Sequence, residues 1–444
     1  MGYLRAATTL CCFTIASIIT TTLCGCGGGG SLSSPATLEV RGQDFDGQRS
    51  VRLHNYNNWG MATNNPEELE GRLEVLARRD NICYAEIVDR RNNTSGWSKI
   101  SPQSLRSLNP NAKIYRLYDL CVKNTWDSDW SDPNDTRYLQ TPLTKAVIDA
   151  NDWWLRDGDG QIVREHDRTW LLDPGKPGFK EALLQNMLAR NAGKGFDGFV
   201  FDGHGMNMVQ QWVIDVGNNP PSEYPTEHEW FAKAVKPMFE YVAAGLRSSG
   251  YRVIVNCVGQ FGTDNYMRQW FRSQIDGTIY EQGAVDWWTN GSGWLPGHII
   301  ERRINAIAND PLEVWVADGG LRDYVADYDQ KQRVSLAMYY VGIPASQEKR
   351  SYHHAYDWTP HWQPLWDFHI GVPAEPAVKR SGKYFWSRKF TQGIVLLNYE
   401  SGDGVTFSLD RTYRTLEGQR VSGDVRLPAH TAMILAVDNA EPSP

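Results

Sequence analysis

Short apolar runs alternate with longer amphipathic segments from about residue 50 to residue 340. Each run is four to seven residues long, and several are apolar at successive positions. Continuous apolar runs of this length are typical of strands that are buried on both faces. The runs predict eight strands, at 51–56, 82–88, 112–118, 198–201, 253–258, 277–280, 312–317 and 336–341.

The segments between the runs carry apolar residues at helical spacing, as Leu69, Leu73 and Leu76 do in the first of them. This pattern predicts helices at 66–78, 179–190, 230–247 and 298–307. Strands that alternate with helices indicate parallel strands joined by helical crossovers. Eight such units in series predict an α/β protein built as a (β/α)8 TIM barrel.

A doubly wound open sheet is the alternative arrangement of alternating strands and helices. Dinucleotide-binding sheets of this kind carry a G-x-G-x-x-G turn after the first strand. This chain has no such turn there, and its strand count also fits a barrel better. We therefore expect the barrel.

Two stretches depart from the simple alternation. The segment 120–172 is too long for a plain connection, and its residues 153–163 indicate a hairpin around Asp-Gly turns that helps to wall a cleft.

After Pro376 the pattern becomes a series of strand-sized runs separated by glycine-containing turns. These runs, at 384–386, 393–397, 405–409 and 431–437, predict a small C-terminal antiparallel β-sandwich.

The first residues of the chain indicate a processing segment. Arg5 precedes an apolar stretch that is interrupted by threonines and is too short to span a bilayer as a mature helix. The stretch ends in Leu23-Cys24-Gly25-Cys26, which resembles a bacterial lipobox and implies cleavage before Cys26 and acylation of its sulfur. An ordinary signal peptide with incidental cysteines is the alternative.

A glycine- and serine-rich tether follows Cys26, and Gly27 replaces the Asp that favours inner-membrane retention of such lipoproteins. We therefore expect a protein of the cell envelope that meets the membrane only through its lipid anchor, at the outer membrane. The expected parts are a signal peptide at 1–25, a tether at 26–44, the barrel at 45–375 and the β-domain at 376–444.

Composition limits the partners. The formal net charge is −7, which gives no electrostatic footprint for nucleic acid. The chain contains 18 Trp and 20 Tyr, an excess that in an exported protein suits stacking on sugar rings. Cysteine and histidine show no metal-ligand spacing, so we expect neither a metal nor another cofactor.

Polar side chains follow the predicted strands at the ends where function belongs in a barrel. In chain order they are Asn55, Asp89, Asp119, Asp202, Asn256, Glu281 and Asp318. Carboxylates that converge from several strands suit the cleavage of a glycosidic bond, which needs one carboxylate at the anomeric carbon and a second to protonate the leaving oxygen.

Three stretches resemble a set of barrel glycosidases that includes α-galactosidases and endo-α-1,4-polygalactosaminidases. They are GFDGFVFDG at 195–203, LDP at 172–174, and the closing run FHIGVP at 368–373 with FWSRKFTQGIVLLN at 385–398. The closest resemblance is to the family called hypothetical glycosyl hydrolase family fifteen. It extends from about the third strand to the C-terminus, and the three stretches in order are more specific than any one of them.

The resemblance implies that Asp202, at the end of the fourth strand, is the nucleophile. It implies an acid/base at the end of the sixth strand, which here is Glu281, although those families often have Asp there. Barrels of the α-amylase kind have Arg two residues before the nucleophile, and Val200 in that place disfavours them.

Further side chains are candidates for substrate contact. They are Asp119, His204, Asn256, Trp287 and Asp318. Structural roles are the alternative for each: the aspartates can cap helices or pair with arginines, and Trp287 can pack beneath its loop. Asp197 is expected to be structural, and Asp173 is expected to cap the helix that follows Pro174.

The expected function is hydrolysis of a glycosidic bond, α-linked, in an exported or cell-surface oligo- or polysaccharide, with retention of anomeric configuration. Two alternatives of another class are a carbohydrate-binding lipoprotein without turnover and an envelope assembly protein that uses the barrel as a scaffold. Intact Asp202 and Glu281 favour the enzyme, and a turnover assay separates it from a binding protein.

Overall fold

The structure is a computed structural model that describes residues 50–55, 66–84, 101–124, 141–166, 169–202, 206, 219, 221–256, 265–281, 283–286, 293–319, 327–355, 362–380, 382–402 and 404–438. The expected signal peptide and tether, including Cys26, lie outside these residues, as does Asp89. Within the described residues, no helix has the length and apolar character needed to cross a bilayer.

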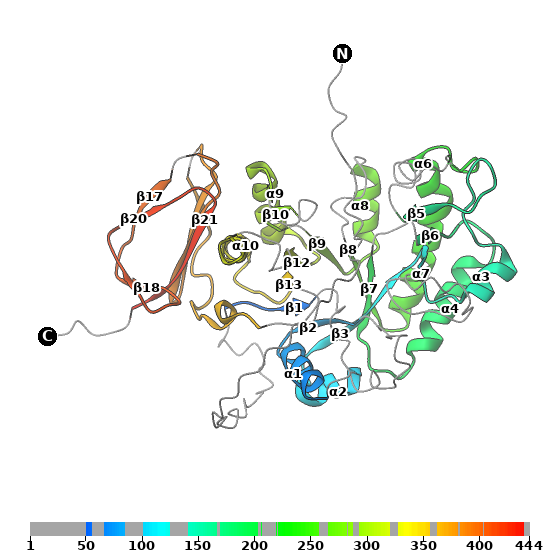
Figure 1. Ribbon diagram of the computed structural model, residues 1–444, viewed down its shortest axis with the longest axis horizontal. Helices are drawn as coiled ribbons and strands as arrows, with labels where there is room; N and C mark the ends of the chain where they lie inside the picture. The colour runs from blue at the N-terminus through cyan, green and yellow to red at the C-terminus, as the bar shows by residue number, and fades with distance from the viewer. Residues whose placement is uncertain are drawn as a thin grey trace, which may run out of the picture. The chain divides into compact units, whose positions relative to one another are not determined.

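Eight parallel strands form the central sheet, which lies near the middle of Figure 1. In their spatial order the strands are β1 (His54–Asn55), β2 (Asn81–Tyr84), β3 (Lys113–Asp119), β7 (Gly198–Asp202), β8 (Arg252–Asn256), β9 (Gly277–Glu281), β12 (Glu313–Gly319) and β13 (Arg350–Ala355). Leu53, next to β1, forms a parallel bridge with Tyr352 of β13 and joins the two edges of the sheet. The predicted TIM barrel is therefore confirmed.

Helices follow the strands and cover the outside of the barrel (Figure 1). They are α1 (Pro66–Ala77), α2 (Pro102–Leu108), α4 (Phe179–Asn191), α7 (Lys236–Ser248), α8 (Asn265–Ser273), α9 (Gly297–Asn309) and α10 (Tyr328–Gly342). The short α6 (Glu227–Trp230) and a π-helical turn, η4 (Phe231–Val235), lead into α7. Their apolar faces pack on the outward side chains of the strands, which is the burial that drives the alternating pattern in the sequence.

The interior of the barrel is a packed core of its own. It contains Cys83, Tyr115, Leu117, Val200, Ile254, Ile279, Trp315 and Ala317, which come from six of the strands and from no helix. Successive side chains of a strand point to opposite faces, so these residues identify the inward positions of each strand. At the amino-terminal end, the inward space is occupied by an ion pair between Arg252 Nη1 and Glu313 Oε2 at 2.6 Å.

The predicted hairpin lies in the long connection after β3. Arg156 and Ile162 form an antiparallel bridge, and Gly160 adopts a φ of 77° in the turn between them. Around it lie α3 (Lys145–Asn151) and a small sheet in the order β4-β6-β5. Those strands span Val122–Asn124 (β4), Arg164–His166 (β5) and Thr169–Leu171 (β6).

Asp173 does not cap the helix after Pro174, as the sequence suggested. Helix α4 begins only at Phe179, after Gly178. Asp173 is buried and accepts hydrogen bonds from Gly175 N at 2.9 Å and from the Tyr224 hydroxyl at 2.8 Å. Burial raises the pKa of its carboxyl, and these two donors oppose that rise. Asp173 therefore holds a turn and the Tyr224 segment together.

The eighth predicted strand was wrong. Residues 336–341 belong to helix α10, and the eighth strand is β13 instead. Helix α10 is buried at every position from Val334 to Gly342, because it packs on the barrel on one side and on the C-terminal sheet on the other. A helix without a solvent face is apolar all round, so a short part of it has the appearance of a buried strand.

Residues 378–437 form the antiparallel sheets of the C-terminal region, drawn in orange and red in Figure 1. Six strands pair in the order β14-β15-β16-β21-β18-β19, and β17 pairs with β20. The strands are β14 (Val378–Lys379), β15 (Phe385–Phe390), β16 (Gly393–Asn398), β17 (Val405–Ser408), β18 (Tyr413–Arg414), β19 (Arg420–Val421), β20 (Asp424–Leu427) and β21 (Thr431–Val437). The predicted β-sandwich is confirmed.

The six-stranded sheet buries both faces. Ile394 and Leu396 pack with Val425 and Leu427 of the smaller sheet. On the opposite face, Val395, Leu397 and Ile434 join the cluster that contains helix α10. This second cluster contains residues of both regions, so the barrel and the β-domain have a common hydrophobic core.

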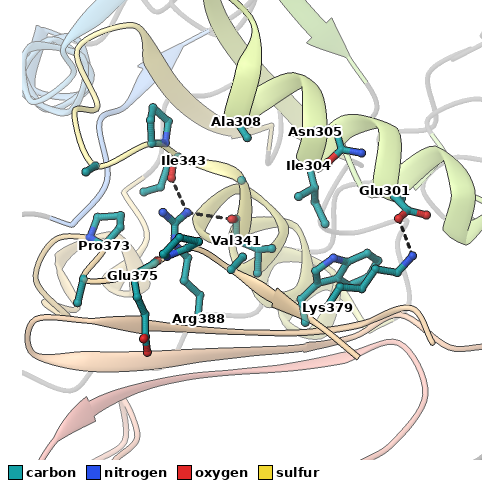
Figure 2. A pocket seen from close by; sticks show the side chains of 17 residues that line it. Glu301, Ile304, Asn305, Ala308, Val341, Ile343, Pro373, Glu375, Lys379 and Arg388 are labelled. Carbon is teal, nitrogen blue, oxygen red and sulfur yellow. Dashed lines mark hydrogen bonds and ion pairs between the residues drawn. The ribbon is translucent and has the colours of Figure 1, made fainter. Parts of the chain in front are cut away.

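Arg388 of β15 links the sheet to the end of α10. Its guanidinium donates to the carbonyl oxygens of Tyr340 at 3.1 Å, Val341 at 2.9 Å and Ile343, as Figure 2 shows for the last two. These carbonyls lie at the C-terminus of the helix, where the backbone has no further donors of its own. Burial lowers the pKa of Arg388 to about 10, so the side chain stays charged at neutral pH.

Replacing Arg388 with methionine should destabilise the fold by about 1–3 kcal/mol, because buried carbonyls then lose their donor. The matched control is Lys389→Met on the same strand, where the exposed ion pair with Asp410 at 2.9 Å should contribute less than about 1 kcal/mol. The urea midpoint of unfolding, followed by far-UV circular dichroism, measures both. Equal midpoints for the two variants would contradict the assigned role of Arg388.

Candidate active site at the barrel mouth

Four of the predicted polar residues lie on the inward faces of their strands at the carboxyl end of the barrel. Asp119 follows the inward Leu117 by two positions, and Asp202 likewise follows Val200. Asn256 and Glu281 have the same relation to Ile254 and Ile279. The alternation of a strand therefore directs these four side chains toward the mouth of the barrel.

Asp202 is the last residue of β7, and its carboxylate has an orienting partner. The Asn256 amide, on the neighbouring strand β8, donates to Asp202 Oδ1 at 3.1 Å. Asp202 is 8% exposed, whereas Asn256 is 1% exposed, so the amide is covered and the carboxylate is not completely covered. A hydrogen bond from a buried amide fixes the direction of the carboxylate without removing its charge.

Asp119 lies beside Asp202, because the two are register partners on β3 and β7. It is 1% exposed, and its Oδ1 accepts a hydrogen bond from Cys121 N at 3.3 Å. The thiol of Cys121 is buried, and burial, with the nearby charges of Asp119 and Asp173, raises its pKa well above the usual value. Asp119 is thus at the same level as Asp202 and is more completely covered.

Glu281 ends β9, and one strand, β8, separates it from Asp202 on β7. Its Cα pairs with that of Ala317 on β12. Unlike Asp119 and Asn256, Glu281 is partly exposed. The structure thus presents one partly accessible carboxyl at the mouth, two strands along from a second carboxylate that is held in a fixed direction.

Asp318 has a different place from the one predicted. Trp315 and Ala317 are the inward residues of β12, whereas Val314 and Val316 pack on the outer layer, so Asp318 faces outward. It is fully buried, and its carboxylate accepts from Ala284 N at 2.7 Å and Val285 N at 3.3 Å. The residue holds the turn that follows Glu281 and does not line the mouth.

Other predicted residues are distributed as follows. His204 and Trp287 lie outside the described residues, so their contact with substrate stays a prediction. Asp197 is at the amino-terminal end of β7, where its Oδ2 accepts from Arg106 at 2.6 Å and from Ile114 N at 2.6 Å. It links α2 and β3 to the start of β7, at the opposite end of that strand from Asp202.

His353 was not among the predicted site residues, because the eighth strand was predicted within α10. His353 lies on β13, and its Cα pairs with that of Ala317, which also pairs with Glu281. The three strands therefore bring His353 and Glu281 to the same level. The imidazole is 8% exposed and is 3.3 Å from Arg79 Nη1.

A cavity of about 620 Å³ lies elsewhere in the molecule (Figure 2). It is lined by α9, by Gly342 and Ile343 at the end of α10, and by the segment that leads into β15. In a barrel the helices run opposite to the strands, so the end of α10 lies toward the amino-terminal end of the barrel. The cavity is therefore separate from the carboxylates, and Asp202 and Glu281 do not line it.

Among the described side chains, no three His, Cys, Asp or Glu residues gather as a possible metal site. The described groups at the mouth are carboxyls and the amide that orients one of them. A pair of carboxyl groups on opposite sides of a cleft can provide a nucleophile and a proton donor.

Comparison with known proteins identifies a family. Residues 106–394 match the family described as "Hypothetical glycosyl hydrolase family 15". The match begins in α2 and ends in β16, so it includes β3, β7, β8, β9 and β12 with all four mouth residues. No curated protein matches the chain in sequence.

Solved structures with a similar arrangement include three glycosidases. A noncanonic maltogenic α-amylase from Thermotoga neapolitana is 10% identical, with a TM-score of 0.48 over 87% of this chain and 98% of that one. An α-amylase from Lactobacillus plantarum is 11% identical, with a TM-score of 0.46 over 87% and 99%. A GH36 α-galactosidase from Geobacillus stearothermophilus is 10% identical, with a TM-score of 0.44 over 87% of this chain and 55% of that chain.

Proposed function

Because the chain belongs to hypothetical glycosyl hydrolase family 15, we propose that it hydrolyses α-linked glycosidic bonds with retention of anomeric configuration. We propose an exported or cell-surface oligo- or polysaccharide as the substrate. The aromatic-rich composition and the lipobox-like residues that end at Cys26 support this choice of substrate and place.

One observation carries the proposal: Asp202 and Glu281 are both directed inward at the carboxyl end of the barrel, with one strand between them. Side chains in that relation can converge on a sugar that binds at the mouth. Asn256 holds Asp202 in a fixed direction at 3.1 Å, as a nucleophile requires. Glu281 is the more exposed of the two, in the place where a leaving group departs to solvent.

The proposed reaction has two displacements at the anomeric carbon. In the first, an Asp202 oxygen forms a bond to that carbon while the glycosidic bond breaks, and Glu281 gives its proton to the leaving oxygen. In the second, Glu281 takes a proton from water, whose oxygen displaces Asp202 and regenerates both groups. Two inversions in sequence return the original configuration.

The test is to incubate the purified protein with a panel of α-linked oligosaccharides and bacterial exopolysaccharides, and to measure the release of reducing ends. Proton NMR of the first product then identifies its anomer before mutarotation. We expect an α-anomer as the initial product from at least one substrate. A β-anomer as the first product would show that the enzyme inverts the configuration. Binding without any cleavage would favour the carbohydrate-binding alternative.

A further inference from the structure

The turn that follows Glu281 is held from two sides by residues far away in the sequence. Asp318 of β12 accepts hydrogen bonds from Ala284 N at 2.7 Å and from Val285 N at 3.3 Å. From the C-terminal β-domain, the Tyr399 hydroxyl donates to Ala284 O at 2.6 Å. Both polar groups of Ala284 are therefore bound to buried side chains.

Packing reinforces these hydrogen bonds. A Cβ placed on Gly283 would lie 3.1 Å from Asp318 Oδ2 and 3.1 Å from Val316 Cγ1, so the backbone of the turn rests directly on β12. After the turn, β10 (Val285–Asp286) pairs with β11 (Gly293–Trp294) in an antiparallel hairpin. The turn and the base of the hairpin are thus a single ordered unit against the strand.

The β-domain also contacts the base of this hairpin. The Trp294 ring meets the Tyr399 ring edge-on, with centroids 5.8 Å apart, and stacks on the His430 ring at 4.9 Å with an interplanar angle of 8°. Tyr399 directly follows β16, and His430 directly precedes β21. Two neighbouring strands of the sandwich therefore present side chains to the segment that begins at Glu281.

The surroundings keep the Tyr399 hydroxyl protonated. Asp318 is 0% exposed and Tyr399 is 1% exposed. Burial, followed by the charge of Asp318, raises the pKa of Tyr399, so its hydroxyl remains a donor at neutral pH. A buried polar group that loses its hydrogen bond raises the free energy of the fold. Asp318 and Tyr399 therefore hold the backbone of Ala284 in this geometry.

We propose that Asp318 and Tyr399 are positioning residues for Glu281, and that the β-domain thereby contributes to the geometry of the barrel mouth. Glu281 is fixed to β12 by its pairing with Ala317, and two residues later the chain is fixed again at Gly283. With both sides of Glu281 held, its carboxyl has a narrow range of directions, as proton transfer to a leaving oxygen needs. This role rests on the proposed function.

The experiment replaces Tyr399 with phenylalanine, which removes the hydroxyl and keeps the ring against Trp294. Tyr413→Phe is the matched control, since that buried hydroxyl donates to Asp410 at 2.7 Å within the β-domain and away from the turn. With a poor leaving group, Tyr399→Phe should lower kcat by up to about 100-fold, the scale of a misplaced catalytic group. With an activated leaving group, which needs little protonation, the loss should be small, and Tyr413→Phe should change neither rate.

A readout that does not depend on turnover accompanies the kinetics. Amide hydrogen exchange at Ala284 and Val285 should accelerate roughly 2- to 10-fold in Tyr399→Phe, the weight of one hydrogen bond, and stay unchanged in Tyr413→Phe. Unchanged exchange overturns the contact. The positioning role is overturned if the unmodified protein is active and Tyr399→Phe shows faster exchange but loses the same factor in kcat on both kinds of substrate. Absence of turnover in the unmodified protein overturns the proposed function, whatever the exchange shows.

Discussion

Replacing Asp202 with asparagine should reduce turnover by on the order of 10⁴- to 10⁶-fold, the scale observed when a member of a hydrolase's nucleophilic machinery is removed. The amide has nearly the shape of the carboxylate and can still meet Asn256, so the fold should persist. It has no negative charge, however, and cannot form the covalent bond to the anomeric carbon. The measurement is kcat on the best substrate, alongside the unfolding midpoint.

The matched control is Asp197→Asn, at the opposite end of the same strand. Asp197 pairs with Arg106 at 2.6 Å, so its replacement should lower stability while leaving kcat nearly unchanged. This opposite pattern separates chemistry from folding. Comparable kcat values in the two variants would show that Asp202 is not the nucleophile.

Replacing Glu281 with glutamine should cost about 10²- to 10⁴-fold in kcat on substrates with poor leaving groups, which is the usual contribution of a general acid or base. With substrates whose leaving group is an acidic phenol, the rate of the first step should fall much less, since the departing oxygen needs little protonation. The measurement is a series of aryl glycosides of graded leaving-group acidity. The rate should depend more steeply on that acidity in the variant than in the unmodified protein.

The pH profile provides the control for this second experiment. In the unmodified protein, kcat/KM should fall on the alkaline side as Glu281 loses its proton, and Glu281→Gln should remove that limb. If Glu281→Gln keeps the alkaline fall of kcat/KM and the same dependence of the rate on leaving-group acidity, the general acid is another group. Asp119, inward and beside Asp202, would then be the next residue to replace.

Most of the barrel could be predicted from the sequence, because its strands are continuous apolar runs between helices. The second to seventh strands lie close to their predicted positions. The eighth could not be identified: β13 contains the polar residues Arg350, Ser351 and His353, all buried, whereas α10 has the apolar run expected of a strand. Only tertiary packing distinguishes these two segments.

The site was predictable in part for a related physical reason. The rule that function follows the carboxyl ends of barrel strands identified Asp119, Asp202, Asn256 and Glu281. It does not say which face of a strand a residue occupies. In β12, Val314, Trp315, Val316 and Ala317 are all buried, so no alternation in the sequence shows that Asp318 faces outward. The contact of Tyr399 with Ala284 joins positions 115 residues apart and leaves no local pattern.

Helix α10 has a consequence for the modularity of this architecture. From Val334 to Gly342 the helix has no solvent face, so this part of its sequence requires a sheet on its outer side, and Arg388 of that sheet completes the last turn. A β-domain that is merely appended can be exchanged or lost between related proteins, but removing this one would expose the buried apolar residues of the last turns of α10. Barrel and sandwich should therefore be inherited together. A related chain whose α10 is apolar in its last turns should also contain the β-domain.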